Sequence, residues 1–270
     1  MATRIKLPVT VTPFGRTGTH RVGIYVFGAG GIGARLVPLL PKLLRPGDLI
    51  HVIDPDQVEP RNLLRQHFET RDLGLNKAEV MQLRYNTPDI HVEGFNMDAE
   101  TYLNTEYGHN IDYRIFVSGV DTKRARQQVK VGYNSGFPPI AWIDVGNETR
   151  EGQVLLWSNA ICQPRDPKCT EDSLRLCGET ALPQVYHGDD PVENTSCAMR
   201  IDVQTATVNN MGAALAANLV AAWINGIPIN ACGWFFSTYN AITPIPLVRD
   251  DHYESYVRSS TMYAKQEGEE

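Results

Sequence analysis

The chain has 270 residues, 42% of them hydrophobic, which is enough for one large α/β domain or two small ones. Its net charge of −6 argues against general nucleic-acid binding, which favours basic surfaces. No apolar stretch approaches the roughly 20 residues of a membrane span, and the N-terminus lacks a secretory-signal plan. Five cysteines, an odd number, do not indicate a disulfide framework. We therefore expect a cytoplasmic protein with reduced thiols and no nucleic-acid or membrane partner.

The first predicted element is a buried strand followed by a glycine-rich turn. The apolar run Val22–Phe27 is short enough for a strand that is buried on both faces. The glycines of the G-A-G-G-I-G sequence that follows are Gly28, Gly30, Gly31 and Gly33. Glycines let the backbone turn tightly and approach a phosphate, while the next helix offers free N–H groups and a positive dipole. Pro38 and Pro41 predict that this helix is short or kinked.

A second buried strand is predicted over 48–53, and an acidic residue follows it. Asp54 comes 21 residues after Gly33, with the place and charge suited to accept hydrogen bonds from ribose hydroxyls. A nucleotide site is predicted by this order of elements: strand, glycine turn, helix, strand and acidic residue. The same order is found in NAD-dependent oxidoreductases, so that function remains an alternative.

The stretch 53–66, I-D-P-D-Q-V-E-P-R-N-L-L-R-Q, carries polar groups that a dehydrogenase does not need. Besides Asp54 and Arg65, they are Asp56, Asn62 and Gln66. Lys77 follows 11 residues after Gln66, in the first turn of a helix predicted over 73–86. Arg65 and Lys77 suit a leaving pyrophosphate, whose charges must be neutralised as the bond breaks. The alternative for Lys77 is a solvated surface charge.

The next two predicted strands, 90–95 and 113–117, lead to a further acidic residue. The second ends in S-G-V-D, which places Asp121 at the carboxyl edge, where doubly wound sheets bind ligands. An aspartate there can bind Mg²⁺ beside ATP phosphates. The alternative is an N-cap for a helix over 122–133, a role that Asp121 could combine with metal binding.

Four motifs in order resemble the adenylate-forming family that contains ThiF, MoeB and the ubiquitin-activating enzymes. They are G-x-G-G-x-G at 28–33, D-x-D-x-V at 54–58, N-L-x-R-Q at 62–66, and the lysine at 77. The resemblance implies ATP and Mg²⁺ as cofactors and assigns nucleotide binding to the four glycines, Asp54, Asp56, Asn62 and Gln66. It implies catalytic roles for Arg65, Lys77 and Asp121, with Asp121 also the metal ligand. The family's asparagine after that aspartate is Thr122 here, which leaves its contact unassigned.

Strands over 139–146 and 152–157 predict a hairpin and a switch to antiparallel pairing. The crossover loop, 158–197, then carries four cysteines: Cys162, Cys169, Cys177 and Cys197. Their spacing lacks C-x-x-C, which argues against zinc. The resemblance implies that the loop passes over the nucleotide and the substrate tail, with Cys197 as the thioester-forming nucleophile. A thiol near a helix N-terminus favours thiolate; Cys169, Cys177 or a buried structural thiol are the alternatives.

An alanine-rich helix over 201–225 and strands over 232–237 and 241–246 close the predicted fold. The small residues of the helix suit packing on the sheet or a dimer seam, and Asn209, Asn210 and Asn218 could lie at an interface. Cys232 is expected to be buried. The S-C-A sequence at 196–198 and the G-W-F…P-I-P closure resemble ThiF-like proteins of bacterial gene clusters that have a ubiquitin-like partner.

We predict an α/β fold: a Rossmann-like doubly wound sheet whose parallel half is continued by mixed or antiparallel strands. The single adenylation domain, 1–270, divides into a nucleotide-binding half (22–157), the crossover loop (158–197), a closing part (198–248) and a mobile tail (249–270). The resemblance implies a homodimer that adenylates the C-terminal carboxylate of a ubiquitin-like protein, forms a thioester and passes it to a downstream conjugating enzyme. Alternatives are adenylation of a peptide or small molecule without a thioester, and a non-catalytic relative that only holds a partner.

Overall fold

The structure is a computed structural model. It describes residues 19–105, 111–134, 141–148, 150–158, 182, 185–186, 206–227, 229, 231–239 and 242–246. The predictions for Cys162, Cys169, Cys177, Cys197 and the tail over 249–270 lie outside these residues.

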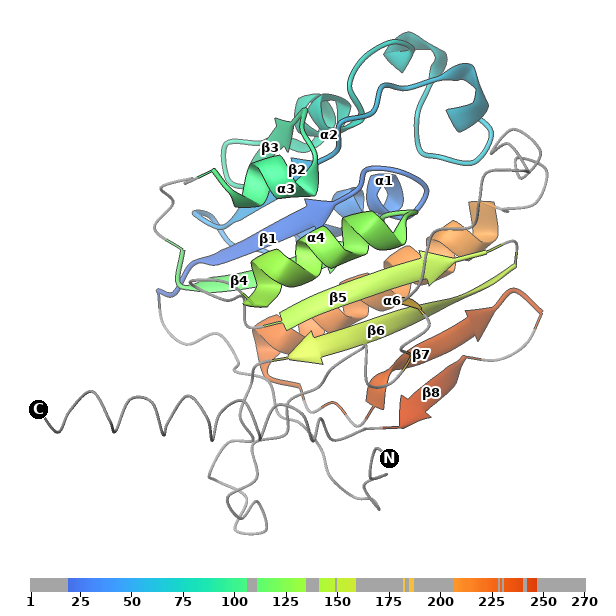
Figure 1. The fold of residues 1–270 in the computed structure, drawn as a ribbon. Coiled ribbons are helices and arrows are strands. Elements are labelled where there is room, and N and C mark those ends of the chain that lie inside the picture. The colour runs from blue at the N-terminus through green and yellow to red at the C-terminus, as the bar shows by residue number, and fades with distance from the viewer. Residues whose placement is uncertain are drawn as a thin grey trace, which may run out of the picture.

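Eight strands form one sheet in the order β3-β2-β1-β4-β5-β6-β7-β8 (Figure 1). The strands are β1 Val22–Phe27, β2 Leu49–Ile53, β3 His91–Phe95, β4 Tyr113–Ser118, β5 Ala141–Asn147, β6 Glu151–Ser158, β7 Ala231–Ser237 and β8 Thr243–Pro246. The first five pair in parallel, and β6, β7 and β8 continue the sheet antiparallel. This confirms the predicted Rossmann-like fold and the switch of direction at the β5–β6 hairpin.

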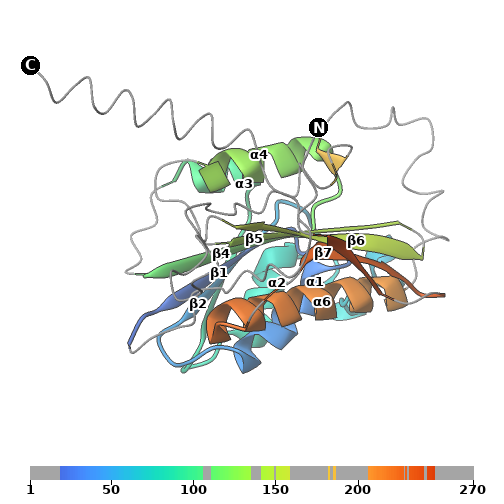
Figure 2. The ribbon, with the colours of Figure 1, turned by 90° about the horizontal axis from the view of Figure 1, so that it is seen from below.

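Helices cover both faces of the sheet (Figure 2). They are α1 Gly33–Leu36, α2 Lys77–Tyr85, α3 Ala99–Leu103, α4 Lys123–Asn134 and α6 Ala206–Asn225. The 3₁₀ turns are η1 Val37–Lys42, η2 Pro60–Asn62 and η3 Thr70–Asp72. Helices α3 and α4 lie on one face, and α1, α2 and α6 lie on the other (Figure 2). The helix after the glycine turn is short, as predicted, and gives way to η1 where two prolines lack the N–H that an α-helix needs.

The core lies on both sides of the sheet. Every residue of β1 and β2 is buried, as expected for parallel strands covered on both faces. On the α4 face, Trp142 of β5 stacks on Trp157 of β6 with 4.8 Å between ring centroids. Cys232 in β7 is fully buried, which confirms that prediction.

Helix α6 packs against the sheet through its small residues. A Cβ at Gly212 would lie 2.8 Å from Ile32 Cδ1 and 3.1 Å from Val145 Cγ1, so a larger residue would force these side chains to move. Asn209 is fully buried within the chain, so the interface position suggested for it is wrong, while Asn210 and Asn218 are exposed. The homodimer stays a prediction. Among the described residues, no helix has the length and apolar character to cross a membrane.

Candidate functional site

The glycine turn lies where the carboxyl ends of β1, β2 and β4 meet. The Gly28 N–H donates to Ile53 O at 2.8 Å, and the Gly119 N–H donates to Phe27 O at 2.9 Å. Gly28 has φ +90°, and a Cβ there would lie 3.0 Å from Gly119 O. Both the backbone angle and the close approach therefore require glycine. This edge is where open α/β sheets bind their ligands.

Two further glycines show which side of the turn is closed and which is open. A Cβ at Gly33 would overlap the carbonyl oxygen of Gly28, so the turn folds back tightly on itself. At Gly30 the nearest atom to a Cβ would be Gln66 Nε2, 3.9 Å away. The backbone is thus open beside Gln66. This opening suits close approach of a phosphate, so the turn fits the triphosphate of ATP.

Asp54 ties the glycine turn to the end of β2. The residue is 5% exposed, and its Oδ2 accepts the Ala29 N–H at 2.6 Å while its Oδ1 accepts the Asp56 N–H at 2.8 Å. Burial raises the pKa of Asp54, against the opposing charge of Lys77 and these two hydrogen bonds. Each carboxylate oxygen has a second lone pair, so the predicted ribose contact stays compatible with this role. The sequence did not predict the bond to the turn.

Lys77 and Asp56 form an ion pair beside Asp54. The Lys77 Nζ lies 2.7 Å from Asp56 Oδ2, and the two side chains are 8% and 66% exposed. Lys77 is therefore not a solvated surface charge. Asn76, which the sequence motifs did not single out, holds the segment after β2 in place. Its Nδ2 donates to Asp54 O at 2.8 Å and to Asp56 O at 3.0 Å, and its Oδ1 accepts the Glu79 N–H. An asparagine just before a helix is a usual N-cap, and this position was the signal that could have identified it.

The N-L-L-R-Q segment is a turn that presents Arg65 and Gln66. Asn62 is buried, and its Oδ1 accepts the Glu59 N–H at 2.8 Å, which caps η2. The Asn62 carbonyl also accepts the Gln66 N–H at 2.8 Å. Arg65 and Gln66 are both half-buried. Asn62 therefore shapes the segment, and its nucleotide contact stays a prediction.

Asp121 lies two residues beyond Gly119 and is exposed. The hydroxyl of Thr122 accepts the Ala125 N–H at 3.2 Å, so Thr122 caps α4 and the N-cap alternative for Asp121 is wrong. Mg²⁺ commonly binds through one or two carboxylates together with substrate phosphates, and an exposed carboxylate at this edge fits that pattern. Within the described ranges, no group of three or more His, Cys, Asp or Glu side chains is placed to hold a metal.

A second polar cluster is enclosed next to this edge. Asp144 of β5 is 1% exposed and accepts hydrogen bonds from three groups. The donors are Ser118 Oγ at 2.6 Å, Tyr186 OH at 3.0 Å and Arg126 Nε at 3.1 Å. Burial raises the pKa of Tyr186 well above its usual value, and the Asp144 charge adds to this. The members come from β4, β5, α4 and residue 186, so no local motif predicts the cluster.

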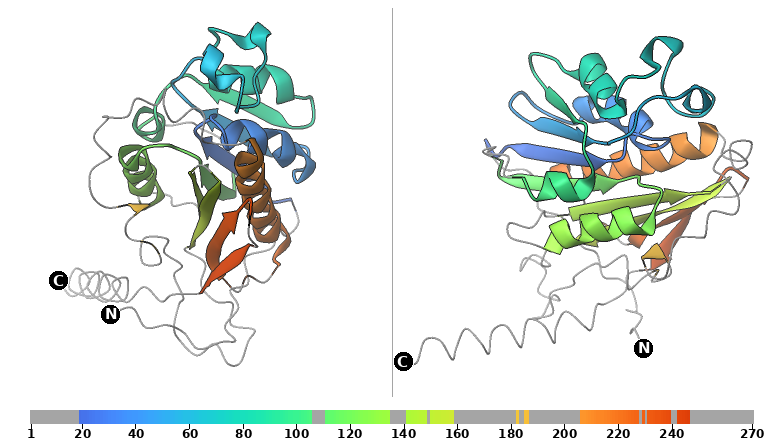
Figure 3. Two further views of the ribbon diagram at one scale, coloured as in Figure 1. Left: turned by 90° about the vertical axis from the view of Figure 1, so that its right-hand side faces the viewer. Right: turned by 45° about the horizontal axis from the view of Figure 1, so that its top comes forward.

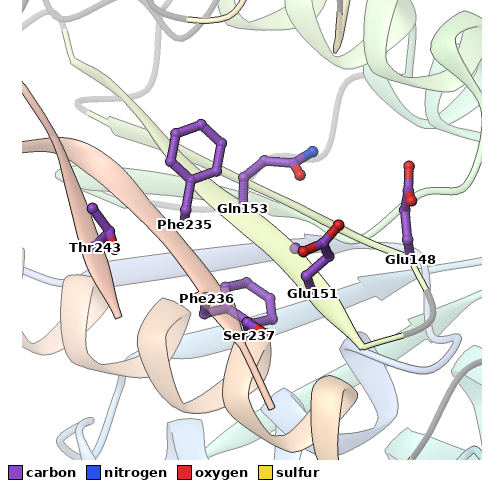
Figure 4. Close-up of a pocket in the computed structure, with 8 residues that line it drawn as sticks. Glu148, Glu151, Gln153, Phe235, Phe236, Ser237 and Thr243 are labelled. Atoms are coloured by element: carbon purple, nitrogen blue, oxygen red, sulfur yellow. The ribbon is translucent and has the colours of Figure 1, made fainter. Parts of the chain in front are cut away.

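A cavity of about 370 Å³ lies over β6, β7 and β8 (Figure 4). Its lining includes Glu148, Glu151, Gln153, Phe235 and Thr243. Gln153 and Phe235 are paired across β6 and β7, and in Figure 4 their side chains point to the same side of the sheet. Its lining comes from three strands and the β5–β6 turn, so no local motif indicates this cavity.

The chain belongs to the ThiF family, whose model matches residues 9–250. It is 32% identical over 140 residues to the NEDD8-activating enzyme E1 catalytic subunit of Saccharomyces cerevisiae, covering 48% of this chain and 46% of that protein. It is 38% identical over 89 residues to the sulfur carrier protein adenylyltransferase of Thermus thermophilus, covering 32% of each. The chain thus spans less than half the length of these two relatives.

Solved structures confirm the fold. E. coli MccB with ATP superposes with a TM-score of 0.53 at 20% identity, covering 85% of this chain and 64% of that one. The microcin C7 biosynthetic enzyme MccB with N-formylated MccA gives a TM-score of 0.53 at 20% identity, covering 85% of this chain and 65% of that one.

Proposed function

We propose that this protein uses ATP to adenylate the C-terminal carboxylate of a ubiquitin-like protein or peptide. The observation that carries the proposal is the convergence of the glycine turn, Asp54 and Lys77 at one sheet edge, in a chain of the ThiF family. An NAD-dependent oxidoreductase needs the turn and the acid, but not the lysine. The relatives named above as activating enzyme and adenylyltransferase also support ATP chemistry.

In the proposed reaction, an oxygen of the acceptor carboxylate attacks the α-phosphorus of ATP. The bond from that phosphorus to the oxygen bridging to the β-phosphate breaks, and pyrophosphate leaves with the electron pair. The product is an acyl-adenylate. Negative charge grows on the leaving pyrophosphate, so cations already held beside it lower the barrier.

The residues divide this work between binding and charge stabilisation. The glycine turn accommodates the phosphates, and Asp54 accepts hydrogen bonds from the ribose. Lys77 and Arg65 neutralise the pyrophosphate, with Lys77 exchanging part of its pairing with Asp56 for a phosphate oxygen. Asp121 would hold Mg²⁺, which supplies further positive charge at the phosphates when it is bound. Asp56, Asn62 and Gln66 complete the nucleotide side of the site.

The cavity over β6, β7 and β8 fits the body of the acceptor rather than its terminus. Glu148 and Glu151 would repel a carboxylate, whereas Phe235 offers an apolar contact. A ubiquitin-like acceptor is suggested by the NEDD8-activating relative, and a peptide by the solved complex of MccB with MccA. Both present a C-terminal carboxylate to the same chemistry.

A thioester step would need a cysteine near the adenylate. Cys232, the one cysteine within the described ranges, is fully buried in β7 and cannot serve. We therefore keep Cys197 as the proposed nucleophile: its thiolate would attack the acyl carbonyl and AMP would leave. A gel without reductant distinguishes the outcomes. Wild type should form a reductant-sensitive adduct that Cys197→Ala does not form, and a protein that never forms one stops at the adenylate.

The test of adenylation is ATP–pyrophosphate exchange with purified protein. The acceptor would be the ubiquitin-like protein or peptide encoded nearest to this gene, and the control would be the same acceptor lacking its last two residues. We expect exchange that depends on the intact terminus and on Mg²⁺. ATP binding without any exchange would support the non-catalytic alternative, and NAD binding in place of ATP would support the oxidoreductase.

A further inference from the structure

We propose that Asn209, on α6, is a positioning residue for adenylation that holds the backbone of Arg65 against the glycine turn. The inference rests on the proposed function, because it assigns Asn209 a role through Arg65. Helix α6 begins more than one hundred residues after the nucleotide motifs, yet its first turn lies at the edge where β5 ends (Figure 3).

One side-chain amide joins two distant segments. Asn209 Nδ2 donates to Arg65 O at 3.2 Å, and Asn209 Oδ1 accepts from Asn147 Nδ2 at 2.8 Å. Asn147 is the last residue of β5. The amide therefore links the Arg65 turn to the carboxyl end of β5, and both its N–H donor and its oxygen acceptor take part in hydrogen bonds.

The glycine turn rests on the same side chain. A Cβ at Gly31 would lie 2.7 Å from Asn209 Nδ2, so a larger residue there would displace the amide. Asn209 thus lies between the glycine turn and the Arg65 turn and contacts both. If the phosphates bind at the turn, this separation decides how far Arg65 lies from them.

A second donor reaches the same carbonyl. Arg35 of α1 donates from Nη2 to Arg65 O at 3.2 Å and from Nη1 to Asn210 Oδ1 at 2.9 Å. Two donors from two helices thus converge on one backbone oxygen. Such a carbonyl is held in both direction and distance, and catalytic groups need this kind of placement.

The chemistry of α6 also sets Asn209 apart. The helix is apolar and rich in alanine, and Asn209 lies on its buried face. A buried amide destabilises a fold unless its hydrogen bonds are made. Asn209 makes both of them at the site edge, to the Arg65 carbonyl and the Asn147 side chain.

The experiment compares Asn209→Ala with Asn218→Ala, which removes an exposed asparagine from the same helix. In pyrophosphate exchange, Asn209→Ala should lower kcat about five- to tenfold, the usual value of one neutral hydrogen bond, and leave the KM for ATP nearly unchanged. Asn209→Asp keeps the shape and the acceptor but turns an oxygen toward Arg65 O, so its loss should be at least as large. Asn218→Ala should match wild type.

A double-mutant cycle with Arg65→Ala decides the mechanism. If Asn209 acts through Arg65, Asn209→Ala should cost little further in the Arg65→Ala background. Fully additive losses, or a loss confined to thermal stability, would overturn the inference. If Asn209→Ala fails to fold, Arg35→Lys replaces it in the same cycle, because lysine keeps the charge but loses the planar fork. Wild-type protein that shows no exchange would instead refute the proposed function.

Discussion

Two buried carboxylates belong to the parallel half of the same sheet, and their surroundings differ. Asp54 follows β2, is 5% exposed, and accepts two backbone N–H groups beside a lysine whose partner is largely exposed. Asp144 lies in β5, is 1% exposed, and is enclosed by Arg126, Ser118 and Tyr186.

The comparison shows that burial and charge pairing do not by themselves mark a functional site. Around Asp144 the charged partner Arg126 and the hydroxyl donors Ser118 and Tyr186 are themselves buried. Beside Asp54, the Lys77–Asp56 pair borders solvent, so a ligand can reach it. The surroundings of Asp144 suit stability and those of Asp54 suit binding, and four experiments test that difference.

The largest expected effect is on the enclosed cluster. Asp144→Ala should lower the free energy of unfolding by about 3–5 kcal/mol, because it leaves the Arg126 charge buried without its partner. Denaturant unfolding measures the loss. The double variant Asp144→Leu/Arg126→Met should recover most of it, since it removes both charges. A single variant as stable as wild type would show that the cluster is not structural.

Lys77→Ala should lower the rate of pyrophosphate exchange by roughly 10²–10³, the usual cost of removing one electrostatic stabiliser. Its effect on unfolding should be small, because the partner Asp56 is left largely in water. Lys42→Ala, an exposed lysine in η1, is the matched control. A loss confined to the KM for ATP would contradict the proposed role in the transition state.

Asp54→Ala should weaken ATP binding by about 1–3 kcal/mol, the value of a hydrogen bond to a charged group. Calorimetry with ATP gives the number. Asp112→Ala is the control, because Asp112 also accepts a backbone N–H, from Arg21 at 2.7 Å, before β4 begins and so at the opposite edge of the sheet. Unchanged ATP affinity in Asp54→Ala would remove the ribose assignment.

The smallest effect is on pH dependence. Burial raises the pKa of Asp54, so the folded state keeps this proton to higher pH than the unfolded state. Ionisation of Asp54 therefore costs stability as the pH rises from about 4 through the folded pKa. The stability of wild type relative to Asp54→Asn should therefore fall over the pH range in which folded Asp54 ionises, which begins above the usual carboxyl range. A flat difference in urea unfolding would mean that Asp54 ionises as easily when folded.

Much of the molecule could be predicted because it is written in local patterns. Buried strands appear as short apolar runs, the glycine turn as G-A-G-G-I-G, and the short first helix as a pair of prolines. The polar set after β2 lies within a few dozen residues, so its placement at one edge follows from the βαβ arrangement. Where the structure describes them, the ends of the strands and helices differ from prediction by only a few residues.

Contacts between residues far apart in the chain could not be predicted in this way. Local patterns were enough for the nucleotide motif, for the order of strands and helices along the chain, and for the position of Asp121 after β4. The tertiary structure decided that Asp54 holds Ala29, that Thr122 rather than Asp121 caps α4, and that Asn209 reaches Arg65. The physical reason is that spacing along the chain predicts which groups share an element or an edge. Hydrogen bonds depend on how separate elements pack, to within a few tenths of an ångström.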